Sequence, residues 1–205
     1  MKSYPSIPYA VTSRLPIIAF DKLDGSNVRA EWSSKRGWYK FGTRHRLIVD
    51  GEPIFGPVPQ LINEKYGEPL ARAIHGAGFD RAVCFFELWG PGSFAGSHDP
   101  NESLTITLLD VAPYNQGILE PERFLRVCGG LDHARIPHWG PCTPEFIEQV
   151  RASELPEMTF EGVVCKAAAE NRAKMPTMFK QKSRAWLEKL HEHCHGDQAM
   201  YSRLI

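Results

Sequence analysis

A chain of 205 residues is the length of about one domain, so we expect residues 1–205 to form a single domain. Because 24 Lys and Arg residues balance 24 Asp and Glu residues, the composition excludes a global positive field. Any nucleic-acid site must therefore be a local patch. The sequence contains no apolar run of about 18 residues and no secretory apolar segment near residue 1, so we expect neither membrane spanning nor secretion.

Cysteine usage indicates a reducing compartment. The cysteines are odd in number, widely spaced and without a Cys-x-x-Cys pair; they are Cys84, Cys128, Cys142, Cys165 and Cys194. They predict free thiols and no disulfide frame. We therefore expect a cytoplasmic protein, in the host cytoplasm if a phage encodes it.

The first part of the chain predicts a hairpin. The stretch LPIIAFDKLDGSNVRAEW, residues 15–32, has two apolar runs around Asp24-Gly25, which is a common pair in tight turns. Lys22 closes the first run, and Ser26 and Asn27 follow the glycine. The next stretch, GWYKFGTRHRLIV at 37–49, predicts a third strand.

The rest of the chain mixes helices and strands. Residues 60–78 predict a helix broken near Gly67-Glu68-Pro69, because proline interrupts helical hydrogen bonding. Thr143 predicts an N-cap. The other expected elements are strands at 81–90, 104–114, 160–167 and 176–183, helices at 120–130, 143–153 and 184–194, and a glycine-rich loop at 90–103. Strands predominate without the alternation of a doubly wound sheet, so the predicted class is α+β with antiparallel sheet.

Four short segments place ionisable groups on or beside apolar strands: KLDGSN (22–27), FFELWG (85–90), EGVVCK (161–166) and KQK (180–182). Lys180 and Lys182 share one face of a strand, because side chains alternate. Two ammonium groups on one face repel unless an anion lies between them, and a phosphate would serve. Taken singly, each segment is commonplace: Lys-x-Asp-Gly is usually a turn, and Lys-x-Lys usually protects an exposed sheet edge.

In this order, the four segments resemble the motifs of the covalent nucleotidyltransferases, which are ATP-dependent DNA ligases, RNA ligases and mRNA capping enzymes. Ser26-Asn27 resembles the RNA-ligase version, since the other branches more often have Arg where this chain has Asn27. FFELWG is similar to a segment of the phage RNA ligase 2 group, with Phe86 in place of the usual Gly. The resemblance implies an antiparallel nucleotidyltransferase domain, and the 23 residues after Lys182 are too few for an OB-fold domain.

The resemblance also implies a reaction. Lys22 would attack the α-phosphate of ATP and form lysyl-AMP. Lys180, Lys182 and a divalent metal would lower the pKa of Lys22 and neutralise the phosphate charge. Glu161 would hold Mg²⁺ or Mn²⁺, a hard cation that prefers oxygen ligands.

The same resemblance assigns the remaining nucleotide contacts. Glu87 would bind the ribose hydroxyls, and Lys166 would contact the α-phosphate. Asn27 would position the phosphate in the later steps. Asp21, Arg44 and Val163 complete the expected nucleotide site, in which Val163 or Val164 covers the purine. No aromatic residue stands where the family usually stacks the adenine, at Thr107, Leu108 and Leu109.

The expected function is therefore an ATP-dependent ligase that joins 5′-phosphate and 3′-OH ends of RNA or of a nicked duplex, as a monomer. Two alternatives stay open: a minimal DNA ligase core and a non-catalytic nucleic-acid-binding module. HEHCHGD at 191–197 could bind zinc, but a solvated helix end is favoured because no second ligand pair has zinc spacing. The glycine-rich loop lacks the Gly-Lys-Ser/Thr of a Walker A motif.

Overall fold

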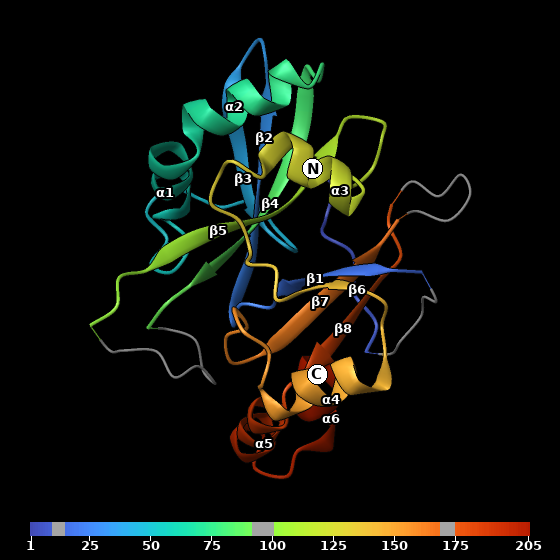
Figure 1. The fold of residues 1–205 in the computed structure, drawn as a ribbon. Coiled ribbons are helices and arrows are strands. Elements are labelled where there is room, and N and C mark those ends of the chain that lie inside the picture. Colours follow the sequence, from blue (N-terminus) through green and yellow to red (C-terminus); the bar gives the residue numbers. More distant parts are fainter. Residues whose placement is uncertain (10–14, 92–100, 169–174) are drawn as a thin grey trace.

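The computed structural model describes residues 1–9, 15–91, 101–168 and 175–205. Two four-stranded sheets dominate it, and every strand pairing in them is antiparallel. We name them the upper and the lower sheet after their positions in Figure 1. The α+β class with antiparallel sheet, predicted from the sequence, is confirmed.

The upper sheet carries helices on one face. Its strands, in spatial order, are β3 (Gly37–Thr43), β2 (Gly25–Ser33), β4 (Arg81–Trp89) and β5 (Thr105–Pro113). Because side chains alternate between the two faces of β2, those of Val28, Ala30 and Trp32 lie in the main core, where three helices cover them. These helices are α1 (Val58–Lys65), α2 (Gly67–Gly76) and α3 (Pro121–Cys128). The break predicted near Gly67 is confirmed, since α1 ends at Lys65 and α2 begins at Gly67.

The lower sheet has its own helices. Its strands, in spatial order, are β6 (His138–Gly140), β1 (Ile17–Asp21), β7 (Gly162–Ala167) and β8 (Met178–Lys182). The helices are α4 (Pro144–Ala152), α5 (Arg184–His193) and α6 (Gln198–Leu204). Thr143 caps α4 as predicted, because its hydroxyl accepts a hydrogen bond from the Phe146 amide at 3.2 Å. The sequence did not predict β6 or α6.

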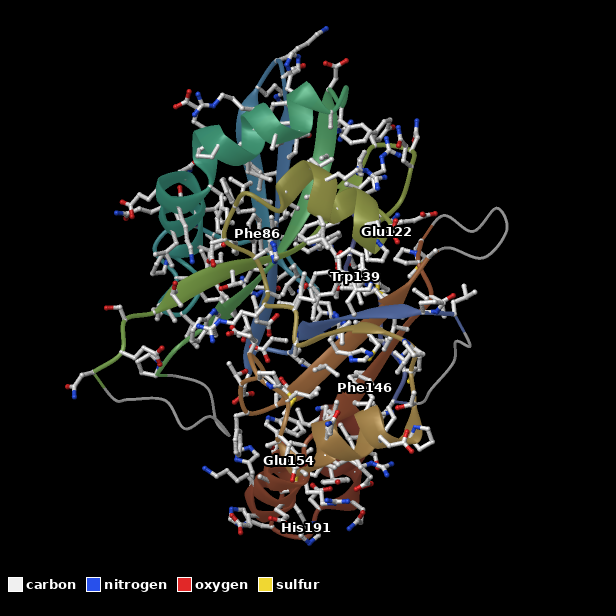
Figure 2. The ribbon with its side chains drawn as sticks, in the orientation of Figure 1. Phe86, Glu122, Trp139, Phe146, Glu154 and His191 are labelled. Atoms are coloured by element: carbon white, nitrogen blue, oxygen red, sulfur yellow. The ribbon has the colours of Figure 1, made fainter. Side chains whose placement is uncertain are left out.

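Strand β1 belongs to both cores, because its side chains alternate between them. Ile18 and Phe20 join the main core of the upper sheet, while Ile17 and Ala19 join the core under α4. Figure 2 marks one member of each core, Phe86 within the upper sheet and Phe146 on α4. The strand is buried along its whole length, as expected for an interior strand with a neighbour on each side.

The predicted hairpin of residues 15–32 is wrong. β1 pairs with β6 and β7, whereas β2 pairs with β3 and β4 in the other sheet. Tight hairpin turns need a residue with positive φ, and Gly25 does not have one. The stretch 22–24 instead crosses from the lower sheet to the upper sheet. The third strand is also shorter than predicted, since β3 ends at Thr43.

Three further expectations concern features outside the sheets. All five cysteines are free thiols. Among the described residues, none of the helices is both long enough and apolar enough to cross a bilayer. The expected glycine-rich loop falls largely outside the described residues, which omit 92–100.

Gly162 is a position where only glycine fits, and this can be tested. Its φ is +135°, and a Cβ there would lie 2.1 Å from the main-chain oxygen of Gln181 in β8. We expect Gly162→Ala to lower the free energy of unfolding by about 3 kcal/mol or more, through backbone strain and overpacking. Gly76→Ala in α2 is the matched control, because a Cβ there meets nothing within 4 Å. Urea denaturation that gives both variants the same midpoint would contradict this account.

Candidate active site

A cavity of about 340 Å³ lies where the two sheets meet. Its walls come from the end of β1, the start of β2, the end of β4, strands β7 and β8, and the N-terminal segment. Nine of the ten residues predicted for the site line it: Asp21, Lys22, Asn27, Arg44, Glu87, Glu161, Lys166, Lys180 and Lys182. The fold thus gathers residues that are up to 161 positions apart in the sequence.

Backbone pairing in the lower sheet brings the central residues together. The Lys22 amide donates to the carbonyl of Gly162 at 2.9 Å, which fixes Lys22 beside the start of β7. Gly162 pairs with Lys182, and the amide of Ser183 donates to the carbonyl of Glu161 at 3.0 Å. The end of β1, the start of β7 and the end of β8 therefore meet at one corner of the sheet.

Glu161 lies between two lysines at this corner. Its Oε1 atom is 2.8 Å from the Nζ of Lys22 and 3.0 Å from the Nζ of Lys182. The Lys182 ammonium also lies 3.3 Å from the centroid of the Trp186 ring, a cation–π contact. Burial, opposed by Glu161, lowers the pKa of Lys182 to about 8. The pKa of Lys180 is lowered in the same way, by burial first and then by the charge of Lys22.

The charge balance at Lys22 differs from the sequence expectation. Burial acts to lower the pKa of Lys22, but the carboxylates of Glu161 and Glu87 outweigh it, so the pKa is raised. Lys180 and Lys182 were expected to lower it. The reason for the difference is geometric, since Glu161 stands between Lys22 and Lys182 and pairs with both. In this state Lys22 is an ammonium ion.

The wall from the upper sheet carries Asn27 and Glu87, which are partners across β2 and β4. The Asn27 amide donates to the carbonyl of Phe86 at 3.3 Å, while its Oδ1 is buried without a partner. Burial raises the pKa of Glu87 to about 8. Gly25 allows this wall to form, because a Cβ there would lie 2.3 Å from the Leu88 oxygen. Gly25 is therefore needed because β2 and β4 approach each other closely at this position, and not because the chain makes a tight turn there.

Asp21 and Arg44 occupy other parts of the cavity wall. The Oδ1 atom of Asp21 accepts hydrogen bonds from the amide and hydroxyl of Thr159, and its Oδ2 is buried without a partner. Burial raises the pKa of Asp21 to about 6. Arg44 donates through Nη2 to the carbonyl of Pro5 at 2.9 Å, so it also holds the N-terminal segment in place.

Lys166 lines the cavity, but its ammonium already has partners. Nζ lies 2.8 Å from both carboxylate oxygens of Asp110 and 3.1 Å from the Leu109 carbonyl, and it packs over the Phe20 ring. Tyr4 donates a hydrogen bond to the same Asp110 carboxylate. The contact of Lys166 with an α-phosphate stays a prediction.

Sequence reasoning missed Tyr4 and Asp110, and only one of them carried a signal. Asp110 interrupts the apolar run of β5 and is 1% exposed. A buried carboxylate needs a paired charge, so an acid inside an apolar strand could have been noticed. Tyr4 offered no such signal, because its contact with Asp110 joins positions 106 residues apart.

Val163 does not reach the cavity, so its predicted place at the nucleotide is corrected. It packs in the core under α4, on the opposite face of β7, while Val164 lines the cavity. The reason is strand alternation: Val164 and Lys166 share one face, and Val163 and Cys165 share the other. Phe20 and Leu109 are further apolar groups on the cavity wall.

A metal at this site would need ligands from outside the protein. In the described parts of the chain, no three His, Cys, Asp or Glu residues meet in a metal-binding group. Glu161 is a carboxylate at the cavity, and Mg²⁺ is commonly held by one or two carboxylates with phosphate oxygens and water. The 191–197 segment does not form a zinc cluster among the described residues. Figure 2 shows His191 at the lower end of the molecule, where its ring contacts Tyr201.

The raised pKa of Glu87 makes stability depend on pH. Between its ordinary value of 4.5 and about 8, the folded state keeps a proton that the unfolded chain releases. This contribution is complete below pH 4.5 and is lost as the pH rises through about 8. Glu87→Gln stays neutral, so we expect the variant to gain stability relative to the wild type between pH 5 and pH 9. Denaturation at several pH values measures this, with the exposed Glu122→Gln as control, and a constant difference between Glu87→Gln and wild type would refute it.

Comparisons with known proteins concern the fold. No protein-family profile matches the chain, and no curated protein matches its sequence. An archaeal ATP-dependent RNA ligase, solved in two forms, superposes with TM-scores of 0.69 and 0.67 at 16% and 18% identity, over 100% of this chain. An RNA ligase from Naegleria gruberi, solved with ATP and manganese, superposes with a TM-score of 0.61 at 15% identity over 86% of this chain. This chain spans 52–56% of the length of these neighbours, and over that span it has the fold of an RNA ligase.

Proposed function

We propose that this chain is an ATP-dependent RNA ligase of the phage RNA ligase 2 type that works through a covalent lysyl-AMP intermediate. The observation that carries the proposal is that Lys22, Lys180 and Lys182 line one cavity shared by both sheets, with Glu161 between Lys22 and Lys182. Residues 1–205 would act as one adenylyltransferase domain, which is supported by the two cores that β1 joins.

ATP and a divalent metal are the proposed cofactors. Neighbours with this fold were solved with ATP or AMP and manganese. Glu161 would hold Mg²⁺ or Mn²⁺ together with phosphate oxygens and water, in the donor set that such a metal accepts. The bound metal would supply positive charge to the triphosphate. Asp21 Oδ2 and Asn27 Oδ1, both buried without partners, could accept hydrogen bonds from the bound nucleotide.

The residues around Lys22 have distinct tasks in the first step. Lys22 must first release one proton from its ammonium group to solvent, and its Nζ lone pair then attacks the α-phosphorus of ATP. The bond from that phosphorus to the bridging oxygen breaks, and pyrophosphate leaves with the electron pair. Lys180 and Lys182 lie where they would offset the negative charge that builds on the phosphates. Glu161 holds the Lys22 ammonium 2.8 Å away until that proton is lost.

The later steps would use the same cavity. A 5′-phosphate oxygen of the polynucleotide attacks the AMP phosphorus, and the bond to Lys22 breaks. A 3′-OH oxygen then attacks that 5′-phosphate and releases its proton to solvent, a phosphodiester forms, and AMP leaves. Because the chain spans about half the length of its structural neighbours, sealing of nicks by this chain alone is the most demanding part of the proposal.

Two alternatives are not favoured. A minimal DNA ligase core would use the same first step, but the archaeal and Naegleria structures that superpose on this chain are RNA ligases. A non-catalytic nucleic-acid-binding module would have no need for two ammonium groups within 3.0 Å of one buried carboxylate. Burying such a cluster of charges carries a desolvation penalty, which a catalytic role at this site would account for.

The first test is the covalent intermediate. With α-labelled ATP and Mg²⁺, the wild type should carry label through a denaturing gel, and Lys22→Ala should carry none. Lys189→Ala on the exposed side of α5 is the control and should label normally. Lys22→Ala should still seal a strand that is already adenylylated, because that step needs no new lysyl-AMP. Label retained by a folded Lys22→Ala protein would remove Lys22 as the nucleophile.

The RNA preference is tested separately with nicked duplexes that differ only in the sugars beside the nick. Proteins distinguish RNA from DNA through the 2′-OH and the A-form shape. We expect faster sealing when the terminal nucleotides of the 3′-OH strand are ribonucleotides, and we expect sealing to fall as salt rises. Equal or faster sealing of the all-DNA nick would favour the DNA ligase alternative and leave the lysyl-AMP chemistry standing.

A further inference from the structure

Although the chain has no net charge, one short segment beside the candidate active site carries basic residues and no acidic ones. Residues 32–49 contain five Lys and Arg residues and no Asp or Glu, although the whole chain has 24 of each kind. The cations are Lys35, Arg36, Lys40, Arg44 and Arg46. A local run of this kind can attract a polyanion that the molecule as a whole would not attract.

This segment forms the edge of the upper sheet and leads to the candidate active site. Its centre is β3, which pairs on one side with β2 and lies at the edge in the order β3-β2-β4-β5. Arg44, just after β3, lines the cavity, while Lys35 and Arg36 lie in the turn at the other end. A strand of seven residues spans about 23 Å, so the segment links the cavity to a surface about that far away.

The cations of this segment that lie far from the cavity have few acidic partners among the described residues. Lys35 and Arg36 are exposed and have no ion pair within the described part of the chain, and Arg36 lies over the Tyr39 ring at 4.5 Å. Lys40 is 3.9 Å from Glu31, whose carboxylate is bound to Arg81. By contrast, Arg46, at the other end of the segment, pairs with Glu52. We name Lys35, Arg36 and Lys40 the basic edge.

The ordinary role of a charged edge strand is to discourage pairing with another sheet. Two observations go beyond that role. The turn residues Lys35 and Arg36 lie before β3 begins, where no ladder groups need protection. The Arg36–Tyr39 stack also combines a cation with an aromatic ring, a combination that recurs on surfaces that bind nucleic acids.

We propose that the basic edge binds the phosphate backbone of the polynucleotide substrate, outside the reacting ends held at the cavity. This inference rests on the proposed function, because it names the surface that holds the substrate beside the nick. We call the double-stranded segment on each side of the nick an arm. About 23 Å corresponds to roughly 7 base pairs at the 3.4 Å rise of B-form DNA, and to slightly more base pairs of A-form RNA, whose rise is shorter. Arms shorter than this would not reach the turn at Lys35 and Arg36.

The experiment compares two triple variants with equal loss of charge. The test variant is Lys35→Ala/Arg36→Ala/Lys40→Ala. The control variant is Arg72→Ala/Arg126→Ala/Arg151→Ala, at exposed positions of α2, α3 and α4. Fluorescence anisotropy measures the dissociation constant for a nicked RNA duplex with arms of about 12 base pairs, at several salt concentrations and without ATP. The double variant Lys35→Ala/Arg36→Ala leaves the Lys40–Glu31 contact intact and serves if the test variant is unstable.

We expect the test variant to bind at least about fivefold more weakly at low salt, and the control variant to bind like the wild type. Each phosphate contact contributes about 0.9 to the slope of log affinity against log salt, so the slope should fall by about 2 to 3 in the test variant. The difference should disappear with arms shorter than about 7 base pairs.

Labelling by ATP separates this inference from the proposed function. It needs no polynucleotide, so the test variant should form lysyl-AMP like the wild type. If the wild type binds the duplex and labels but the test variant keeps its affinity and salt slope, the basic edge does not hold RNA and a partner of another kind, such as an acidic protein, would have to be sought. A wild type that binds no nicked duplex also overturns the inference, whereas a wild type that binds but does not label contradicts only the proposed function.

Discussion

The candidate site depends on one carboxylate held between two ammonium groups. Glu161 pairs with Lys22 and Lys182 through the same oxygen, at 2.8 Å and 3.0 Å. Without this anion, the two lysines would place like charges at the corner where β1, β7 and β8 meet. Removing one partner of a buried ion pair leaves an uncompensated charge, which is strongly destabilising. Glu161 is therefore a structural constraint as well as the proposed ligand for a metal.

Local sequence patterns were sufficient for most of the fold. The helix break at Gly67, the Thr143 cap and the apolar strands β4 and β5 follow from propensity and periodicity, which are properties of neighbouring residues. The cavity residues were found differently, through the order of four motifs along the chain. Motif order preserves spatial relations that no local rule contains, and nine of the residues that the resemblance grouped line one cavity.

The errors share a physical cause, because each depended on tertiary partners. The Asp24-Gly25 pair is typical of a hairpin, yet β1 pairs with β7 in the lower sheet and β2 pairs with β4 in the upper sheet. Val163 and Val164 are equally apolar, and only the register of β7 decides which of them reaches the cavity. β6 is three residues long and offers too little pattern to detect.

The sharing of β1 between two cores has a mechanical consequence. If one sheet rotated against the other about β1, one set of β1 side chains would have to leave its packing partners. That set would be either Ile18 and Phe20 in the main core or Ile17 and Ala19 in the core under α4. Close-packed interiors resist such displacement, so β1 hinders rotation of the two sheets relative to each other. The corner that carries Lys22 therefore keeps its shape, so a ligand must fit the β1 side of the cavity as it stands.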